Sequence, residues 1–340
     1  MSLLSLQLVG SPTSQFFFDL SVLYAKDVVC PEGFDLLFAI AYPDGQWSVS
    51  THLDTSVPRV SLSEMIQKVQ EADLAVPHMF CQTGLTSIRI LFEEILHVPL
   101  VGASGQVLSI AQNKHFTKLI AQDLGVSVPK GCCTISTVIA PEILSDFSWP
   151  VIVKPNCADN SEGLSLVKEK GALSEAIEKA LSFDAEVLLE EFIPGRELRG
   201  AVIKQGEQYY TPAFIEYGVS QARPIREKED KLKFQEDGQL LAQSEKHQVP
   251  AQCPAMLTEE LKAELTQMMI TLHEGLHCRD FSMYDFRIHA QTGKPYLLEA
   301  GLFWSFSKTS MISSMLQAEG ADLVAITKTL WTTAAKRAVT

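Results

Sequence analysis

The segment from Tyr284 to Gly301, YDFRIHAQTGKPYLLEAG, constrains the fold of this chain more than any other. It predicts an antiparallel hairpin, in which the strands FSMYDFRI and KPYLLEA are joined by the turn QTG. Asp285 and Glu299 lie on opposite strands, so this turn brings their carboxylates to neighbouring positions. Carboxylates that close repel each other unless a cation lies between them, and Mg²⁺ prefers such oxygen ligands together with phosphates. The alternative is that each acid faces solvent.

Composition narrows the class of protein. The 340 residues are 46% hydrophobic, which is enough for a large core and for two or three domains. The net charge of -13 argues against a binder of nucleic-acid backbones. No apolar run approaches the roughly 20 residues that span a bilayer, and the N-terminus lacks the basic start of a secretory signal. We therefore expect a cytoplasmic protein without a membrane or nucleic-acid partner, whose seven cysteines stay reduced.

Hydrophobic patterning predicts three lobes and a mixed α/β (α+β) fold. Strand and helix patterns alternate over residues 3–104 and end in SIRILFEEIL, a predicted helix, with a short buried strand after it. The segment IAQNKHFTKLIAQDLG predicts one further helix, closed by Gly125. A helix begins at Thr258, after a charged stretch from Arg223 to Gln252 that we expect to be a mobile loop. The expected lobes are an N-terminal substrate lobe (1–103), a central lid (104–189) and a C-terminal catalytic lobe (190–340).

Lys154 ends the apolar strand VIV directly before a polar loop that holds Asn160, Ser161 and Gly163. A lysine on a rigid strand can hold a phosphate charge, and small loop residues let backbone N–H groups approach phosphate oxygens. Lys114 can reach the same phosphates if its predicted helix packs beneath the lid. The alternative is a solvated lysine at a strand end.

The segment EVLLEEFIPGREL predicts a strand that runs into a linker between lobes. At this linker backbone groups can contact an adenine edge, and Phe192 and Ile193 can supply apolar contact. Glu197 is then placed for ribose hydroxyls. An acidic turn between two strands is the alternative for Glu191.

These segments, in this order, resemble the ATP-grasp superfamily, and within it the D-Ala-D-Ala ligase-like enzymes, from PHMF to the C-terminal helix. The resemblance implies an ATP-grasp fold that binds ATP between the central lid and the C-terminal lobe. It implies an ADP-forming C–N ligase that phosphorylates a substrate oxygen, uses Mg²⁺ or alternatively Mn²⁺, and displaces the phosphate with an amine. The residues that it assigns to ATP are Lys114, Lys154, Ser161, Gly163, Glu190, Glu191, Phe192, Ile193, Glu197 and Leu298, and those for the metal are Asp285 and Glu299.

The chain departs from this family at positions that bind metal and substrate in the family. Gly301 stands where the family has a metal-ligating asparagine, and Met283 stands where it has an arginine that binds substrate carboxylate and developing oxyanion. We expect Arg287 to compensate from a different direction. We also expect Lys231 or Lys233, from the charged stretch, to place a cation over the γ-phosphate.

The stretch GLFWSFSKTSMISSM replaces the family's acceptor-binding turn, and we expect Trp304, Ser305 and Ser310 to contact substrate. Its aromatic residues suit a ring-containing substrate, unless they belong to the core. Together with GSPTSQFFFDLSVLYAKD it most resembles the enzymes that join mycosporine-glycine to serine or threonine, giving an imine mycosporine-like amino acid of the shinorine or porphyra type.

Other interpretations stay open. One is a dipeptide ligase for non-standard amino acids, and another is a non-catalytic ATP-binding protein, suggested by Gly301. In each case the expected partners are small molecules. The resemblance is also compatible with a homodimer.

Overall fold

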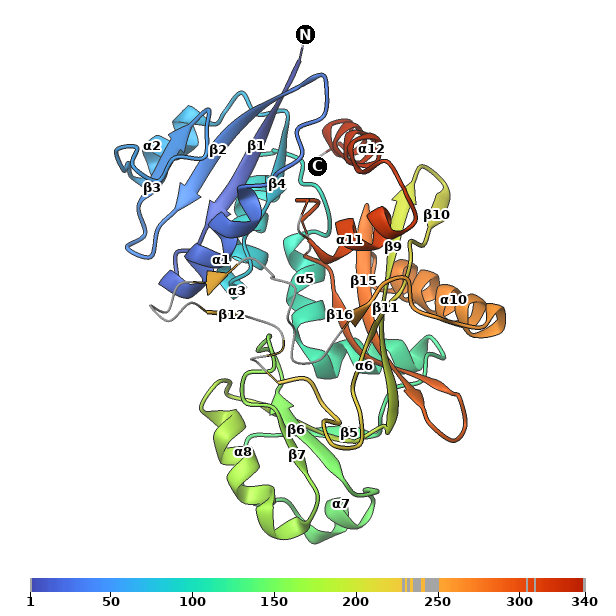
Figure 1. The fold of residues 1–340 in the computed structure, drawn as a ribbon. Coiled ribbons are helices and arrows are strands. Elements are labelled where there is room, and N and C mark those ends of the chain that lie inside the picture. Colours follow the sequence, from blue (N-terminus) through green and yellow to red (C-terminus); the bar gives the residue numbers. More distant parts are fainter. Residues whose placement is uncertain are drawn as a thin grey trace.

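The computed structural model describes residues 2–227, 230, 233–234, 240–241, 251–303, 305–308 and 310–338. The described strands form separate sheets in the N-terminal, central and C-terminal parts of the chain. Figure 1 shows the N-terminal sheet in blue at the upper left, the central sheet in green at the bottom, and the C-terminal sheet at the right. Within the described residues, no helix is both long and apolar enough to cross a membrane.

The N-terminal sheet has the order β3-β2-β1-β4. Strand β1 pairs in parallel with β2 and β4, and β3 pairs antiparallel with β2. Most of β1 is buried on both faces, as expected for a parallel strand covered by helices. The strand predicted after SIRILFEEIL is reduced to one bridge, Ala75 to Leu100. The elements are β1 (Leu3–Gly10), α1 (Gln15–Ala25), β2 (Phe34–Ala41), β3 (Trp47–Ser50), α2 (Leu62–Lys68), β4 (Leu74–Pro77), α3 (Gln82–Leu85), α4 (Ser87–Ile90) and the π-helix η1 (Leu91–Ile95).

The central sheet, which we call the lid sheet, is antiparallel and has the order β5-β8-β6-β7. Helix α8 packs on it through Leu173, Ala176, Ile177 and Ala180, whose spacing of three and four places them on one helix face. The elements are β5 (Gly131–Thr134), α7 (Pro141–Ser145), β6 (Val151–Pro155), β7 (Ser165–Val167), the 3-10 helix η2 (Lys170–Ala172), α8 (Leu173–Leu181) and β8 (Val187–Glu191).

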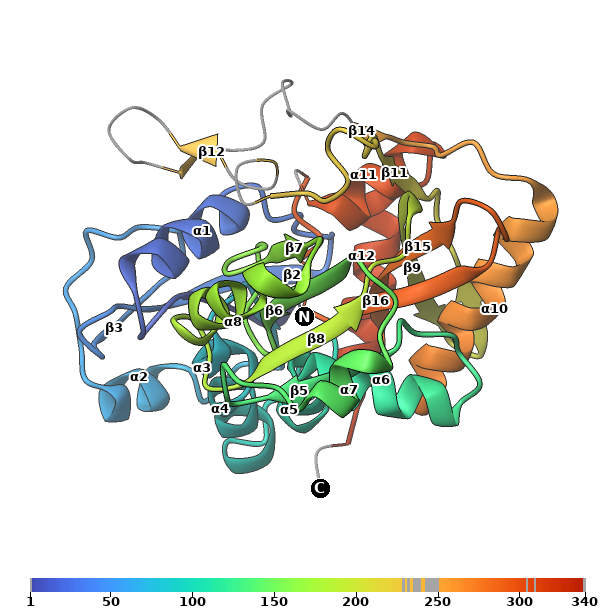
Figure 2. The ribbon, with the colours of Figure 1, turned by 90° about the horizontal axis from the view of Figure 1, so that it is seen from below.

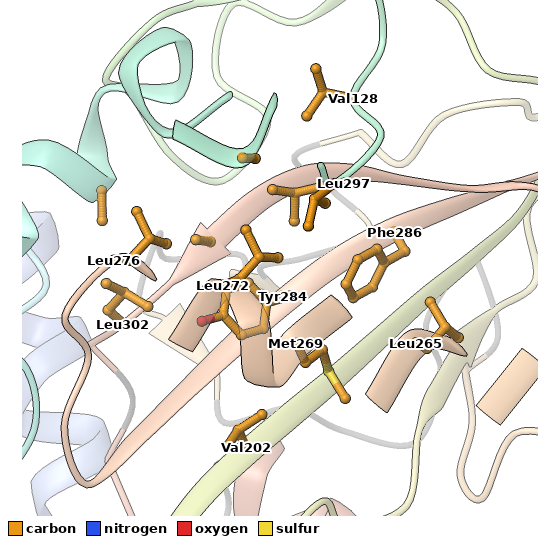
Figure 3. Close-up of a cluster of buried hydrophobic side chains, with 14 of the residues drawn as sticks. Val128, Val202, Leu265, Met269, Leu272, Leu276, Tyr284, Phe286, Leu297 and Leu302 are labelled. Carbon is orange, nitrogen blue, oxygen red and sulfur yellow. The ribbon is translucent and has the colours of Figure 1, made fainter. Parts of the chain in front are cut away.

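The C-terminal sheet has the order β14-β11-β9-β15-β16, with β10 paired to β9. Helix α10, capped by Thr258 as predicted, covers one face and buries Leu265, Met269 and Leu272 against Tyr284 and Phe286 of the sheet (Figure 3). The elements are β9 (Gly195–Gln205), β10 (Gln208–Tyr210), β11 (Ile215–Tyr217), β14 (Ala251–Gln252), α10 (Glu259–Gly275), β15 (Phe281–His289), β16 (Pro295–Gly301), α11 (Met311–Ala318) and α12 (Leu323–Ala335).

The single helix predicted over IAQNKHFTKLIAQDLG is wrong, because the chain forms two helices, α5 (Gly105–Gln112) and α6 (Lys114–Asp123). Asn113 lies between them in an extended conformation, and its side chain accepts a hydrogen bond from Phe116 N–H at 2.9 Å. Asparagine is a strong N-cap, so it begins a new helix here. Both helices pack into the core of the C-terminal sheet (Figure 2). The three lobe boundaries stay predictions.

The charged stretch is described only in part. Its residues Lys233–Phe234 form β12, which pairs antiparallel with β13 (Leu240–Leu241). Arg226 and Asp230, in this stretch that was expected to be a mobile loop, are buried. Asp230 pairs with Arg223, and Arg226 pairs with Glu197 and Asp285 in the candidate site. A sequence pattern does not reveal these ion pairs.

Candidate nucleotide and metal site

The hairpin of β15 and β16 places Asp285 directly opposite Glu299. The strand register shifts between Asp285 and Phe286, so Leu298 has no partner of its own on β15. Successive strand residues ordinarily face opposite sides, but a β-bulge re-aims them. Leu298 and Glu299 consequently line the same cavity.

This cavity, of about 750 Å³, lies between the lid sheet and the C-terminal sheet. It brings together the residues that the sequence assigned to ATP and metal, apart from Gly163, which lies in the loop beside it. Those residues come from β6, β8, β9, β15, β16, the start of α6, and the connections that follow β6 and β8. The lining is Lys114, Ile152, Lys154, Pro155, Ala158, Asp159, Asn160, Ser161, Glu162, Leu164, Glu190, Glu191, Phe192, Ile193, Glu197, Ile225, Arg226, Asp285, Arg287, Leu298 and Glu299.

Glu190 is buried beside two lysines. Its carboxylate accepts from Lys118 Nζ and from Lys154 Nζ, each at 2.5 Å. Burial by itself would raise the pKa of Glu190, but the two ammonium groups outweigh it and leave that pKa lowered. Burial lowers the pKa of Lys118 to about 8, although Glu190 opposes this. The three groups form a charged cluster, of which Glu190 and Lys154 line the cavity.

Lys114 lies at the edge of the cavity, between the loop and the metal carboxylates. Its Nζ donates to the Ala158 carbonyl at 2.5 Å and lies 3.9 Å from Glu299 Oε2. It begins α6, and the break at Asn113 sets its direction. A cation at this position can bind a phosphate oxygen close to a metal that Glu299 would hold.

The loop between β6 and β7 has a left-handed backbone at Asn160, Ser161 and Gly163, with φ of 57°, 60° and 68°. A Cβ on Gly163 would lie 2.8 Å from Pro155 Cγ and 2.9 Å from Phe183 Cδ2. Gly163 therefore packs closely against Pro155 and Phe183, and it does not line the cavity. Ser161 Oγ donates to the Arg226 carbonyl at 2.9 Å and ties this loop to the C-terminal part.

The linker after β8 is already engaged in internal hydrogen bonds. The N–H groups of Glu191 and Phe192 donate to the carbonyls of Lys130 and Pro150, at 2.8 and 3.1 Å. The Glu191 carboxylate accepts from Ser148 N–H at 2.7 Å. These two N–H groups thus already donate to backbone carbonyls of the protein. Phe192 and Ile193 supply the apolar lining.

Glu197 is held by two arginines. Its Oε1 accepts from Arg226 Nε at 2.5 Å, and its Oε2 accepts from Arg287 Nη2 at 2.9 Å. Arg287 also donates to the Gly195 and Pro224 carbonyls, and burial lowers its pKa. Arg287 therefore lies beside the linker and the predicted ribose acid. This placement does not support the expectation that it replaces the missing substrate-binding arginine.

Asp285 is paired with Arg199 of the neighbouring strand β9 through two hydrogen bonds of 2.5 and 2.6 Å. Arg226 Nη2 lies 3.7 Å from the same carboxylate. In the described part of the chain, no group of three His, Cys, Asp or Glu residues could hold a metal. Asp285 and Glu299 nevertheless fit Mg²⁺ as hard oxygen donors, provided that phosphate oxygens and water complete the coordination and Arg199 gives way.

A second, larger cavity of about 2250 Å³ adjoins the first and shares Lys114, Asp285 and Glu299 with it. Helix α1 contributes Phe17 and Tyr24 to its wall. The Tyr24 ring lies 5.0 Å from that of Phe80, which lies 6.3 Å from that of Phe303. This aromatic wall joins the N-terminal lobe to the C-terminal one. Its partly buried position also raises the pKa of Tyr24 to about 12.

The residues predicted to bind substrate lie elsewhere. Ser305 is buried and donates to Ser307 Oγ, and it lines a separate small cavity. Ser310 is the buried N-cap of α11, and its Oγ accepts from Ser313 N–H. Neither residue is among those described as lining the larger cavity, because helix capping and core packing use both side chains. Phe306 is likewise core.

Three of the predicted positions cannot be placed in the site. Trp304 and Lys231 lie outside the described residues. Lys233 lies in β12, where only the backbone is described.

Sequence reasoning missed Lys118, Arg199 and Arg226. Lys118 follows Lys114 by four residues, which places both on one helix face, so this signal was available. Arg199 follows Glu197 by two residues on one strand, and that spacing puts both on one sheet face. The position of Arg226 depends on long-range pairing with Glu197, for which the sequence carries no local signal.

Comparisons with known proteins agree with this geometry. A family model described as D-ala D-ala ligase C-terminus matches residues 131–332. The chain is 28% identical over 265 residues to a D-alanine–D-alanine ligase of Acetivibrio thermocellus, covering 75% of this chain and 65% of the relative. A Chlorobium limicola D-alanine–D-alanine ligase is 28% identical over 241 residues, covering 68% and 62%. The chain thus spans less than two thirds of the length of these curated relatives.

Solved structures match nearly the entire chain. VanG D-Ala:D-Ser ligase from Enterococcus faecalis has a TM-score of 0.78 at 20% identity, covering 98% of this chain and 99% of its own. The D-alanine-D-alanine ligase from Coxiella burnetii has a TM-score of 0.76 at 18% identity, covering 99% and 94%. These likenesses confirm the expected ATP-grasp fold. With the family model matched over more than half of its length, this chain belongs to the D-Ala-D-Ala ligase C-terminus family.

Proposed function

We propose that this protein is an ATP-dependent, ADP-forming ligase that joins two amino-acid-like substrates through a C–N bond, as a D-Ala-D-Ala ligase-like dipeptide ligase. The observation that carries the proposal is the junction of the two cavities. Lys114, Asp285 and Glu299 line both, so a nucleotide in the smaller cavity can present its γ-phosphate to a substrate in the larger one. Phosphoryl transfer requires such positioning and charge neutralisation rather than a protein nucleophile.

In the proposed reaction, a carboxylate oxygen of the first substrate attacks the γ-phosphorus of ATP and ADP leaves, which gives an acyl phosphate. The amine of the second substrate then attacks the carbonyl carbon, the C–O bond to phosphate breaks, and the amine loses a proton as the C–N bond forms. Bound Mg²⁺ would neutralise charge on the phosphates. Asp285 and Glu299 would hold it, and Lys114 and Lys154 would bind phosphate oxygens.

The apolar side chains of the smaller cavity indicate where the adenine ring would bind. The Phe192 and Ile193 side chains offer apolar contact for an adenine ring, and Leu298 lies in the same cavity. For Glu197 to bind ribose hydroxyls, it must share its oxygens with Arg226 or Arg287 or release one of them. Support for ATP as the nucleotide also comes from a similar structure, the Bacillus anthracis D-alanine–D-alanine ligase complexed with ATP, with a TM-score of 0.72.

A second candidate is the ligation of mycosporine-glycine to serine or threonine, in which a ring ketone oxygen is phosphorylated and an imine forms. The observation that favours it is the aromatic wall of Tyr24, Phe80 and Phe303, which suits a ring. The names of the relatives agree better with amino-acid substrates and hence with the dipeptide ligase.

The test is ADP release by the purified protein with ATP, Mg²⁺ and pairs of substrates. The panel contains D-alanine, D-serine, other D- and L-amino acids, and mycosporine-glycine with serine or threonine. We expect ADP with at least one amino-acid pair and a matching dipeptide by mass spectrometry. A shift of ultraviolet absorption to longer wavelength with mycosporine-glycine would select the second candidate, and ATP binding without ADP for any pair would favour a non-catalytic protein.

A homodimer, a cytoplasmic location and small molecules as the sole partners remain part of the proposal. So does a loop lysine, Lys231 or Lys233, over the γ-phosphate. Measuring the mass of the protein in solution by light scattering tests the dimer directly.

A further inference from the structure

We propose that Arg199, Tyr217 and Arg226 form a binding site for an anionic oxygen of the substrate, and that Arg199 becomes available to it when a divalent metal replaces it on Asp285. This inference rests on the proposed function and adds residues that recognise the substrate. It also predicts an order, in which metal–nucleotide binding prepares the site for the anion.

The position of Arg199 supports the first step. Arg199 lies opposite Asp285 in the register of β9 and β15, and its guanidinium holds both oxygens of that carboxylate. It lines the larger cavity, whereas Arg226 and Asp285 line both cavities. Arg199 therefore lies on the substrate side of the carboxylate that the metal would use.

Tyr217 supplies an independent observation. Its side chain is 6% exposed, it lines the larger cavity, and its Oη has no hydrogen-bond partner in the described part of the chain. The Arg226 guanidinium lies 3.6 Å from its ring centroid and that of Arg199 lies 5.6 Å away. A buried hydroxyl without a partner costs about 1–3 kcal/mol, so the stability of the fold does not account for it. A phenol near two guanidinium groups is the donor set that an anionic oxygen needs.

The exchange follows from charge. Arg199 donates to both oxygens of Asp285, and its positive charge would repel a divalent metal bound to the same carboxylate, so Arg199 and the metal compete for Asp285. Once displaced, a buried guanidinium without a counter-anion is costly. A substrate carboxylate, or the acyl phosphate formed from it, can take the place of Asp285 as its partner. The reacting oxygen would then lie beside the metal and the γ-phosphate.

The first experiment measures Mn²⁺ binding in the presence of ADP, from the electron paramagnetic resonance signal of free Mn²⁺. Arg199→Met removes the competitor for Asp285, so we expect Mn²⁺ to bind about 5- to 10-fold more tightly. Arg196→Met is the matched control, because Arg196 lies on the same strand and holds Glu216 in a similar bidentate pair outside both cavities. Unchanged or weaker Mn²⁺ binding in Arg199→Met would overturn the exchange.

The second experiment measures turnover with the active substrate pair. Arg199→Met is expected to lower kcat about 100-fold while it tightens metal binding, and a merely structural role would not move these two quantities in opposite directions. Arg199→Lys should recover only part of the rate, because an ammonium group cannot make the two-pronged contact.

Tyr217→Phe is a variant that should still fold, since it removes only the unpartnered hydroxyl. We expect its melting temperature and its Mn²⁺·ADP affinity to match wild type and its KM for the substrate to rise about 10-fold. Wild-type KM in this variant would contradict the anion site. If wild type itself fails to bind Mn²⁺·ADP, the proposed function fails rather than this inference.

Discussion

At the scale of single residues, three buried carboxylates of the candidate site already have cationic partners without any ligand. Glu190 holds two lysines, Glu197 holds two arginines, and Asp285 holds Arg199. Buried charges need such partners, because an uncompensated one costs several kcal/mol. On the proposed function, ligand binding would therefore exchange partners among preformed charges, and the arginines would decide which carboxylates become available.

Gly163 permits a direct test of the phosphate loop. Gly163→Ala places a Cβ against Pro155 and Phe183 at a left-handed φ, so we expect a loss of about 1–2 kcal/mol of stability and an about 10-fold weaker affinity for Mg²⁺·ADP. Gly171→Ala is the control, because no atom lies within 4 Å of its Cβ position. Calorimetric titration checks both variants, and equal affinity for the nucleotide would remove Gly163 from the site.

His78 gives a pH-dependent prediction. Burial beside Arg89 lowers its pKa from 6.5 to about 4, and its Nε2 contacts Gln7 Oε1 at 2.8 Å. The unfolded chain then binds more protons than the folded one between pH 6.5 and 4, so stability falls as the pH falls through that window. The full effect is about 3 kcal/mol. In urea unfolding, His78→Gln should flatten this dependence, and an unchanged slope would contradict the assignment.

At the scale of elements, the break between α5 and α6 positions Lys114. Asn113→Ala removes the cap of α6, which should cost about 1 kcal/mol of stability. It should also weaken Mg²⁺·ADP binding, because a continuous helix would turn Lys114 away from Ala158. Asn113→Ser, which keeps a capping oxygen, should retain both stability and affinity. Weak binding in both variants would indicate that another property of Asn113 matters.

The sequence predicted the elements that depend on local patterns. The hairpin of Asp285 and Glu299, the strand that ends at Lys154 and the helix that begins at Thr258 each follow from the period of apolar residues or from a cap. The bulge at Leu298 could not be predicted, because one unpaired residue depends on how two strands fit together. The pairing of Arg199 with Asp285 requires strand order, which no local pattern encodes.

At the scale of the whole molecule, the site lies where separate parts of the chain meet. The lid sheet supplies Lys154 and Glu190, the C-terminal sheet supplies Asp285 and Glu299, and α1 contributes Tyr24 to the larger cavity. The residues proposed to bind nucleotide and substrate therefore come from more than one of these parts. The substrate roles expected for Ser305 and Ser310 stay predictions. In this structure Ser305 lines a separate small cavity and Ser310 caps α11, and their positions in the sequence did not reveal this placement.

The junction of the two cavities is tested most directly by ADP release and product formation in wild type and Glu299→Gln. Glutamine keeps the shape of residue 299 but removes the charge that a metal needs. We predict that wild type releases one ADP for each C–N bond formed, and that Glu299→Gln is about 100-fold slower. Equal rates in the two proteins, or ADP without a joined product for every pair, would contradict the account.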